Sequence, residues 1–583
     1  MNENGDRVHS EGEDSQEYAK FLIELLEAEI ELLQAEQDSD SDIKVIYPIL
    51  KQRQHLLNVG FAETLQQVAQ RLIADQNPET IELIVPLIEN MSIHISDFPL
   101  GSRANNIEIA ITGYQIVLNN RQPGSEMFAQ TQNNLANAYS HRINGSRAEN
   151  LEWAIEFYQA ALTVYTLENF PEYWARTQNN LAVAYLYRIN GSRAENLERA
   201  IEFYEAALTV RTLEAFPEQW ARTQNNLAVA YSDRINGSRA ENLERAIEFH
   251  DAALTVYTLK DFPEDWAGTQ NNLANAYSDR INGSPAENLE RAIEFYQAAL
   301  TVRTLEDFPI DNVKTLNNLG WAYLAKLDYI NQEKPEDTNQ KAATLQSAYN
   351  TFKNAIAGAA QLRKLESQNE TKQKHDLQWD RLYRGMVQVC LHRESNQEAL
   401  LYAEANKARN LAEVIAQKQE ISKTLAPITF SEITQLLTPN TALIEWYITN
   451  EEIITFVVTY PDVLTVYRHR KRAELTNLVN EYRQAYKQSK TDWQKQLSTY
   501  LQRLADILQI ATILPPSSTR LILIPHWLLH LFPLHALPLT DGEFLLDRFL
   551  EGIQYAPSCQ LLQQITITQI LTNSSPCKTP PRI

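Results

Sequence analysis

One block of sequence returns along this chain at a fixed interval of 46 residues. Gln-Asn-Asn-Leu begins at Gln132, Gln178, Gln224 and Gln270, and an altered copy, Leu-Asn-Asn-Leu, begins at Leu316. Self-similarity at a fixed period is the sequence signature of a solenoid, in which each repeat packs against its neighbours. We therefore expect the middle of the chain to form an extended array whose surface can bind a partner.

The pattern within each unit predicts two helices joined by a short turn. The first helix opens with proline, which a first helical turn accepts because its missing N–H would be unpaired there. It ends before Asn190-Gly191, where glycine can adopt the left-handed conformation of a helix stop. Ser192 and Glu195 have the spacing of a capping box for the second helix. The same signals recur at Pro171, Pro217, Pro263 and Pro309, and at Ser146/Glu149, Ser238/Glu241 and Ser284/Glu287.

Apolar residues form one stripe on each helix of the unit. The small Ala182 and Ala200 let the two helices approach closely, and aromatic residues such as Tyr204 fill the space around them. One unit buries about eight apolar side chains at roughly 2 kcal/mol each. Ordering its backbone costs about 1–2 kcal/mol per residue. A single unit therefore cannot fold alone, and stacked neighbours must supply the rest.

These positions resemble the tetratricopeptide repeat, which has Leu, a small residue and Tyr in the first helix and Ala, an aromatic residue and Ala in the second. The chain differs in placing Gln178 at the family's Trp position, with Trp174 one turn earlier. Its 46-residue period is also longer than the family's 34 residues, as in the kinesin-light-chain-like branch. The resemblance implies a mostly α fold, an α-solenoid of long repeats. The matching residues are Leu181, Ala182, Tyr185, Ala200, Tyr204 and Ala207.

The resemblance also implies that the first helices line a groove that binds a protein or peptide. Asparagines recur along this face, and a side-chain amide can both donate to and accept from a peptide backbone. The same amides could instead bond between neighbouring repeats, and both roles remain open. The basic residues that accompany paired asparagines in relatives that bind peptide C-termini are only partly present. The predicted groove residues are Asn133, Asn137, Arg176, Asn179, Val183, Tyr187, Arg222, Asn225, Val229, Asp233, Asn271, Asn275 and Asp279.

Composition and periodicity divide the rest of the chain. Residues 1–16 predict a disordered acidic tail, 17–100 a helical N-terminal domain, 101–365 the repeat array and 366–424 terminal helical hairpins. In residues 425–583 the pattern changes, because β-branched and aromatic runs replace the helical spacing. These runs predict strands at 441–449, 452–460, 463–470, 519–526 and 552–558, with helices at 472–488 and 491–510.

The C-terminal segment resembles the CHAT domain, a caspase-like peptidase domain that follows tetratricopeptide repeats and is common in filamentous cyanobacteria. The resemblance implies a partial α/β caspase-like domain over residues 425–583. Half of such a sheet would leave an unpaired strand edge and an uncovered apolar face. We therefore expect residues 441–583 to be less stable than the repeats. The residues that carry the resemblance are Leu521–His526, Leu529–Pro533, Ala536–Pro538 and Tyr555–Ser558.

The catalytic pair of that family is a His in a His-Gly step and a Cys in a Ser-Ala-Cys-like step, and neither step occurs in this sequence. We therefore expect no catalytic residue and an incomplete domain that ends by truncation or frameshift. The alternative is a regulated caspase-like cysteine peptidase whose catalytic half is lost in this way. A Cys559–His526 dyad is disfavoured, because Cys559 opens a presumed helix. A zinc site from His526, His530 and His535 is disfavoured too, because a structural zinc site needs four ligands.

The composition narrows the classes of function. A net charge of −22 argues against nucleic acid, whose phosphates require clustered Lys and Arg. Three widely spaced cysteines fit a reducing compartment, and the N-terminus lacks the apolar stretch of a signal peptide. No run of about eighteen apolar residues is present, so we expect a cytoplasmic protein without a membrane span. Phosphate-loop and His-Glu-x-x-His motifs are missing, so we expect no cofactor and no metal site.

Together the patterns predict a protein–protein interaction scaffold that binds its partner in the solenoid groove. It would carry a catalytically incomplete CHAT domain. A purely structural scaffold that binds no peptide is the third hypothesis. The patterns make no prediction for the oligomeric state.

Overall fold

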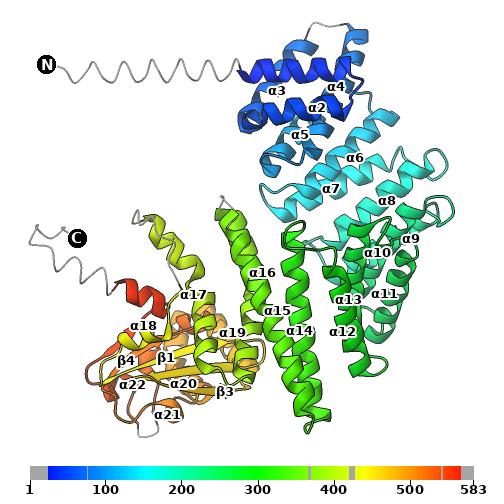
Figure 1. Cartoon of the computed structure of the whole chain (residues 1–583). Helices are drawn as coiled ribbons and strands as arrows, with labels where there is room; N and C mark the ends of the chain where they lie inside the picture. Colours follow the sequence, from blue (N-terminus) through cyan, green and yellow to red (C-terminus); the bar gives the residue numbers. More distant parts are fainter. Residues whose placement is uncertain (1–23, 75–76, 366–368, 419–426, 540–541, 566–583) are drawn as a thin grey trace, which may run out of the picture. The chain divides into compact units, whose positions relative to one another are not determined.

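The computed structural model describes residues 24–74, 77–365, 369–418, 427–539 and 542–565. The chain divides into two compact units, Met1–Asn288 and Leu289–Ile583, and each is described by itself (Figure 1). The first unit is helical throughout its described residues, and the second adds a mixed β-sheet. The acidic tail predicted for residues 1–16 and the proline-rich end of the chain lie outside the described residues.

The first unit begins with helices that pack around a small apolar core. Leu25, Leu50 and Phe61 are fully buried in this core. Helical structure is therefore present from residue 24 onward, as the apolar spacing predicts. The elements are a helix over residues 24–38, α2 (Ile43–Gln52), the 3-10 turn η1 (Gln54–Leu56) and α3 (Val59–Ile73).

The repeats follow as successive helical hairpins, coloured from light blue to green in Figure 1. In α8 and α9 the predicted stripe residues Leu181, Ala182, Leu197, Ala200 and Tyr204 are buried, and successive hairpins from α4 to α12 pack against one another. The solenoid predicted from the period is therefore confirmed. The helices are α4 (Pro78–Asp97), α5 (Arg103–Asn119), α6 (Glu126–His141), α7 (Arg147–Ala161), α8 (Pro171–Leu186), α9 (Arg193–Leu208), α10 (Pro217–Asp233), α11 (Arg239–Leu254), α12 (Pro263–Asp279) and α13 (Pro285–Leu300).

A tight Asn-Gly-Ser turn joins the two helices of each hairpin. Gly191 has a φ of +78°, and the Ser192 hydroxyl accepts from the Glu195 N–H that opens α9. The predicted glycine stop and serine cap are thus confirmed. The sequence did not predict a further hydrogen bond across the turn, in which the buried Asn196 donates from Nδ2 to the Asn190 carbonyl at 2.9 Å. The equivalent glycines Gly145, Gly237 and Gly283 have φ values of +76°, +80° and +81°.

A related turn, with Leu100 in place of the asparagine, occurs between α4 and α5, before the copies that are evident in the sequence. Gly101 has a φ of +83°, and Ser102 is the N-cap of α5. Asn106 donates from Nδ2 to the Leu100 carbonyl at 3.1 Å, as Asn196 does to the Asn190 carbonyl. Repeat geometry therefore already spans residue 100, where the sequence places the end of the N-terminal helical domain. The domain boundary itself stays a prediction.

The second unit contains long helices that pack closely around one aromatic ring. Phe352 of α15 is fully buried, and a Cβ added at Gly320 of α14 or at Gly385 of α16 would overlap its ring. The two glycines therefore allow α14 and α16 to approach α15, because neither presents a side chain at the contact. The helices are α14 (Pro309–Glu333), α15 (Thr338–Leu365), α16 (Asn369–His392), α17 (Asn396–Lys418) and α18 (Phe430–Gln435).

The sheet of the second unit has the strand order β3-β2-β1-β4-β5. Strands β1, β2 and β3 form an antiparallel meander, whereas β4 pairs parallel to β1 and β5 pairs parallel to β4. All of the strands predicted from the sequence are present, although the last is short. They are β1 (Thr441–Ile448), β2 (Ile453–Thr459), β3 (Val463–His469), β4 (Arg520–Ile524) and β5 (Ile553–Tyr555).

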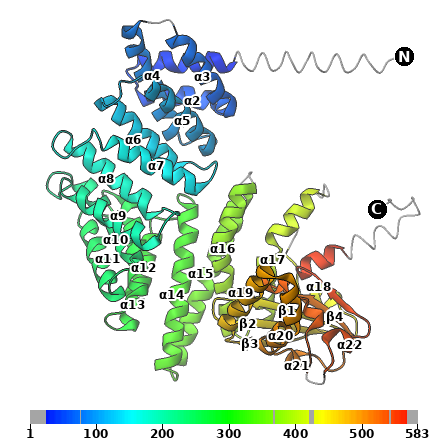
Figure 2. The same ribbon diagram turned by 180° about the vertical axis from the view of Figure 1, so that it is seen from behind.

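Both faces of the central strands are covered. Ile444 and Trp446 of β1 belong to a core with α19 and α20, which lie in front of the sheet in Figure 2. Leu443 and Tyr447 face the opposite core, which α16, α17 and α18 complete. The expectation of an uncovered apolar face is therefore wrong for β1, β2 and β4. The other elements are α19 (Arg472–Gln488), α20 (Lys490–Leu508), α21 (Ile510–Ile513), η2 (Trp527–Leu531), η3 (Leu534–Ala536) and α22 (Leu545–Arg548).

Candidate protein-binding surface

The predicted groove residues lie in, or directly after, the first helices α6, α8, α10 and α12. Spacings of three and four residues place them on one side of each helix, away from the core stripe. Their accessibility differs, and Tyr187 is 57% exposed. Arg222, Asp233, Asn275 and Asp279 are also exposed. Half-buried residues are Asn137, Arg176, Val183, Asn225 and Val229, and buried residues are Asn133, Asn179 and Asn271.

Two of the buried asparagines connect neighbouring repeats. The Thr177 hydroxyl donates to Asn133 Oδ1 at 3.1 Å, and the Thr223 hydroxyl donates to Asn179 Oδ1 at 3.2 Å. Both threonines are fully buried. A buried carbonyl oxygen needs such a partner, because leaving it unpaired costs about 1–3 kcal/mol. For these two positions the geometry favours the role between repeats.

The half-buried asparagines Asn137 and Asn225 also accept hydrogen bonds from neighbouring side chains. Asn137 Oδ1 accepts from the Tyr158 hydroxyl at 2.5 Å and from Asn180 Nδ2 at 3.1 Å in the next repeat. Asn225 Oδ1 accepts from His250 Nδ1 at 3.1 Å, and burial lowers the pKa of that histidine to about 3. The imidazole is therefore neutral and donates from Nδ1. These bonds hold the amide oxygens in fixed positions along the face.

The exposed charged positions of the face form surface ion pairs. Asp233 pairs with Arg193 at 2.8 Å, and Asp279 pairs with Arg239 at 3.0 Å. Pairs at this level of exposure contribute only about 0–1 kcal/mol to stability. A partner that offers better geometry could therefore replace either pairing at little cost.

A further set of ion pairs, which was not predicted from the sequence, connects each repeat to the preceding one. Arg188 binds both oxygens of Glu152 in the preceding hairpin, at 2.8 and 2.7 Å. Its guanidinium also lies 5.4 Å from the centre of the Tyr185 ring. The hydrogen bonds from Arg188 hold the pKa of Glu152 below its ordinary value. The signal was present, since the same pairs recur as Arg142–Glu108, Arg234–Glu198 and Arg280–Glu244.

In the second unit, a buried polar cluster lies beneath β1. Glu404, Glu445 and Cys559 are fully buried and close together, and Lys407 Nζ lies 2.8 Å from Glu445 Oε1. Burial raises the pKa of Glu445, and the Glu404 carboxylate adds to that rise. Among the described residues, this is the group whose spacing would suit a metal ion. The Lys407 ammonium supplies the positive charge there instead.

Cys559 and His526, which the sequence considered as a dyad, have other partners. The Cys559 thiol lies 3.8 Å from Glu445 Oε2, and burial raises its pKa, with Glu404 and Glu445 adding to the rise. His526 Nδ1 accepts from the Ile448 N–H at 2.9 Å, and its ring stacks on Tyr447. A thiol with a raised pKa is a poor nucleophile, because the thiolate is the reactive form.

Comparison with known protein families finds a match in the repeats. The sequence profile of the tetratricopeptide repeat matches residues 174–208, 220–254 and 266–302. These three segments have the sequence pattern of the tetratricopeptide repeat. These matches begin at Trp174, Trp220 and Trp266 and take in the tryptophan that precedes each Gln-Asn-Asn-Leu block by one turn. A comparison with curated proteins returned no match.

Several solved structures are similar to this chain. BtubC (BKLC) from P. vanneervenii is 22% identical, with 42% of this chain covering 90% of that one at a TM-score of 0.30. A STAND protein with a tetratricopeptide repeat sensor from Pyrococcus horikoshii is 14% identical, with coverages of 69% and 53% and a TM-score of 0.37. A Rap protein complexed with Competence and Sporulation Factor is 10% identical, with coverages of 69% and 99% and a TM-score of 0.33. We draw no conclusion from similarities at these TM-scores.

Across the described ranges, the helices also lack the combination of length and apolar character that a bilayer crossing requires.

Proposed function

We propose that this protein is an interaction scaffold that binds a protein or peptide along the first helices of its tetratricopeptide repeats. The observation that carries the proposal is that the buried and the exposed residues of that face have different roles. The buried amides of Asn133 and Asn179 bond between repeats, while Tyr187, directly after α8, and Asp233 of α10 are exposed. A rigid face with exposed aromatic and charged groups suits peptide recognition, because little side-chain freedom is lost on binding.

The test is selection of peptides from a random library displayed on phage, with the full chain as bait. Tyr187→Ala should weaken the selected peptides about tenfold, since a central exposed aromatic residue contributes roughly 1–2 kcal/mol to an interface. Glu202→Lys is the matched control, because Glu202 is exposed on the second helix α9. Its affinity should stay within about twofold of the wild type. Equal losses in both variants would contradict binding along the first helices, whereas no enrichment of peptides would favour a purely structural scaffold.

For the second unit, we propose a CHAT-related domain that performs no catalysis. The four matching segments from Leu521 to Ser558 support this relationship. The surroundings of Cys559, which is buried beside Glu445, support the lack of catalysis. The competing proposal for this chain is a cysteine peptidase that uses the Cys559–His526 dyad, and it needs a thiolate with a histidine as its base.

A thiol-reactive probe separates the two proposals. Full-length protein is treated with an iodoacetamide fluorophore near neutral pH, and the modified cysteine is located by mass spectrometry. We expect Cys559 to react far more slowly than the same residue in urea-unfolded protein, because it is buried with a raised pKa. Fast modification of Cys559 that is lost in His526→Ala would support the peptidase.

A further inference from the structure

Arginines that follow the second helices Arg103–Asn119 and Arg193–Leu208 make the same hydrogen bond to a threonine of the next first helix. Arg121 donates from Nη1 to the Thr131 hydroxyl at 2.6 Å, at the start of the next first helix. Arg211 makes the same bond to Thr223 at 3.1 Å. In each case the threonine hydroxyl lies against a side chain of the preceding first helix, Glu89 for Thr131 at 3.0 Å and Asn179 for Thr223 at 3.2 Å. The two sites can therefore be compared group by group.

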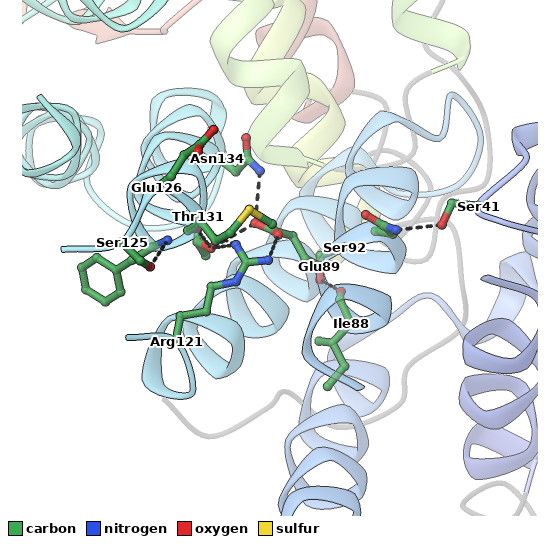
Figure 3. Close-up of polar contacts among 12 residues, drawn as sticks. Ser41, Ile88, Glu89, Ser92, Arg121, Ser125, Glu126, Thr131 and Asn134 are labelled. Atoms are coloured by element: carbon green, nitrogen blue, oxygen red, sulfur yellow. Dashed lines mark hydrogen bonds and ion pairs between the residues drawn. The ribbon is translucent and has the colours of Figure 1, made fainter. Parts of the chain in front are cut away.

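At Arg121 the site is complete (Figure 3). Glu89 Oε2 lies 2.5 Å from Arg121 Nη2, and the side chains are 4% and 7% exposed respectively. Glu89 Oε1 also lies 3.4 Å from Asn134 Nδ2. A buried guanidinium is costly unless it is paired, and here a carboxylate of the chain itself provides the counter-charge.

At Arg211 the corresponding site lacks its anion. The residue is only 7% exposed, and the neutral Asn179 takes the place of Glu89. In the described part of the chain, no carboxylate lies within ion-pair distance of Arg211. Burial lowers the pKa of this arginine to about 10, and the charges of Arg222 and Arg176 add to the effect. Arg211 therefore remains a cation near neutral pH, in a place where the other repeat supplies a carboxylate.

Arg176 brings a second cation to the same place. Its guanidinium lies over the Tyr173 ring at 4.9 Å, and its Nε is buried without a hydrogen-bond partner. Among the described residues, no carboxylate pairs with Arg176 either. Arg222 differs, because Glu218 pairs with it at 2.6 Å. The uncompensated charge is thus concentrated on Arg176 and Arg211.

These two arginines line a cavity of about 290 Å³ between α8 and the start of α10. Tyr173, Phe216, Gln219 and the exposed Glu172 form other parts of its wall. A water molecule occupies about 30 Å³ of the liquid, so this volume holds a carboxylate side chain with several waters. The cavity is therefore large enough for the group that is missing.

We propose that the Arg176–Arg211 cavity binds the carboxylate of an aspartate or glutamate side chain from the protein or peptide partner. The proposal rests on the binding function proposed above and names one subsite of it. The chain's own Glu89 provides the precedent, because it pairs with Arg121, the arginine that corresponds to Arg211. Two guanidinium forks offer the planar donors that a carboxylate accepts, and an aromatic wall suits the methylene groups that carry it.

The sequence makes this cavity distinctive among the repeats. The position of Arg211 is Tyr165 one repeat earlier, Tyr257 one repeat later and Arg303 two repeats later. The position of Arg176 is Gly268 two repeats later. The combination of Arg176 and Arg211 is therefore not reproduced at the repeat that carries Arg303. A single acid-specific subsite would fix the register of a peptide along an otherwise repetitive face.

The direct test measures thermal stability of the full chain with N-acetyl-glutamate amide, against N-acetyl-glutamine amide at matched ionic strength. We expect the glutamate compound alone to raise the melting temperature, and Arg176→Gln to abolish the rise. Arg222→Gln is the control, since Glu218 already pairs with that arginine. A rise that survives in Arg176→Gln, or no difference between the two compounds in the wild type, would overturn the proposal. A larger rise with inorganic phosphate would reassign the cavity to phosphate.

A second test supplies the carboxylate from the chain itself. Asn179→Glu places a carboxylate where the repeat of Arg121 has Glu89, so we expect it to stabilise the chain at low salt and to abolish the response to the glutamate compound. If Asn179→Glu leaves that response intact, the proposed position of the ligand is wrong. Neither measurement requires a selected peptide, so failure of the library selection would count against the scaffold function and not against the cavity.

The selected peptides provide the third test. Replacing their Asp or Glu residues by Asn or Gln should weaken binding about tenfold at one position, because the charge-assisted hydrogen bonds to the arginines would be lost. The same replacement should have little further effect on the Arg176→Gln chain. Peptides that bind without any acidic residue, and equally well to both chains, would contradict the acidic subsite while supporting the scaffold.

Discussion

At the scale of single residues, Arg121 and Arg211 are both buried cations, but within the described residues only Arg121 has a carboxylate beside it. Arg121 is neutralised by the buried Glu89. Glu89→Gln would keep the shape of the side chain but leave a buried cation without its partner, which costs about 3–5 kcal/mol. We expect the unfolding free energy of the first unit to fall by that amount. Urea denaturation followed by circular dichroism measures it.

Two further variants control this prediction. Glu89→Leu combined with Arg121→Met removes both charges, and it should lose much less than Glu89→Gln, because no buried charge is left unpaired. Arg211→Met should cost less than about 1 kcal/mol, since it removes a hydrogen bond to Thr223 but breaks no ion pair. A loss in Glu89→Gln no larger than that in Arg211→Met would show that the buried pair is not important for stability.

The residue scale is also where the sequence was least informative. The period predicted the positions of Asn133 and Asn179 but not their use, because an amide serves a ligand or a neighbouring repeat equally well. The deciding partners, Thr177 and Thr223, lie 44 residues away in sequence. The difference between Arg121 and Arg211 was hidden for the same reason, since it depends on what the preceding first helix places beside each.

At the scale of one element, the turn between paired helices depends on a glycine conformation. Gly191 has a φ of +78°, and an added Cβ would meet Asn196 Oδ1 at 3.8 Å, which is an ordinary contact. The cost of a side chain is therefore conformational and not steric. We expect Gly191→Ala to lower the unfolding free energy by about 1 kcal/mol.

Gly191→Asn tests this cause, because asparagine tolerates the left-handed region better than alanine does. We expect Asn to cost less than Ala, although its side chain is larger. Thermal melts of the two variants give the order. The opposite order, with Asn the more damaging, would mean that space and not φ limits this turn.

Close helix packing in the second unit leads to another prediction. Gly385→Ala adds a methyl group that overlaps the buried ring of Phe352. Overpacking of this kind costs about 1–3 kcal/mol, which exceeds the roughly 1 kcal/mol that alanine gains over glycine in a helix. We expect Gly385→Ala to destabilise the second unit in chemical denaturation. Phe352→Leu in the same chain should recover part of the loss, whereas additive losses would exclude a direct clash.

Elements were predicted better than their packing. The strands of the meander and the capped helices of the repeats follow from local patterns, namely β-branched runs and the Asn-Gly-Ser turn. The cover of the sheet does not, because Leu443 and Tyr447 pack against α16 and α17, which begin 72 and 45 residues before β1, as well as against the nearby α18. Local patterns contain no information on such contacts. The expectation of a bare sheet face therefore failed even though its strands were placed correctly.

At the scale of the whole molecule, the repeats are joined by the same ion pair again and again, so acid should act on many interfaces together. Arg188, Arg234 and Arg280 hold the pKa values of Glu152, Glu198 and Glu244 below the ordinary value of 4.5. A carboxylate with a depressed pKa in the folded state stabilises the protein above its unfolded pKa. That contribution is lost as the pH falls through the folded pKa.

We therefore expect the triple variant Arg188→Gln, Arg234→Gln and Arg280→Gln to be less stable than the wild type near neutral pH. Three such pairs contribute about 1–3 kcal/mol together. The difference in unfolding free energy should narrow once the pH falls below about 4.5, because protonated glutamates no longer attract the arginines. It should not vanish, since each arginine also lies over a tyrosine ring, a contact that carboxylate protonation leaves in place.

Denaturation of both chains across this pH range, at low and high salt, measures the effect. Added salt should narrow the difference near neutral pH, because partly exposed pairs are screened. Arg199→Gln is the control, since its pair with Glu202 is exposed and lies within one helix. It should match the wild type at every pH. A gap for the triple variant that is independent of both pH and salt would assign the whole contribution of these arginines to their contacts with tyrosine rings, and the joints between repeats would then be packing contacts and not electrostatic ones.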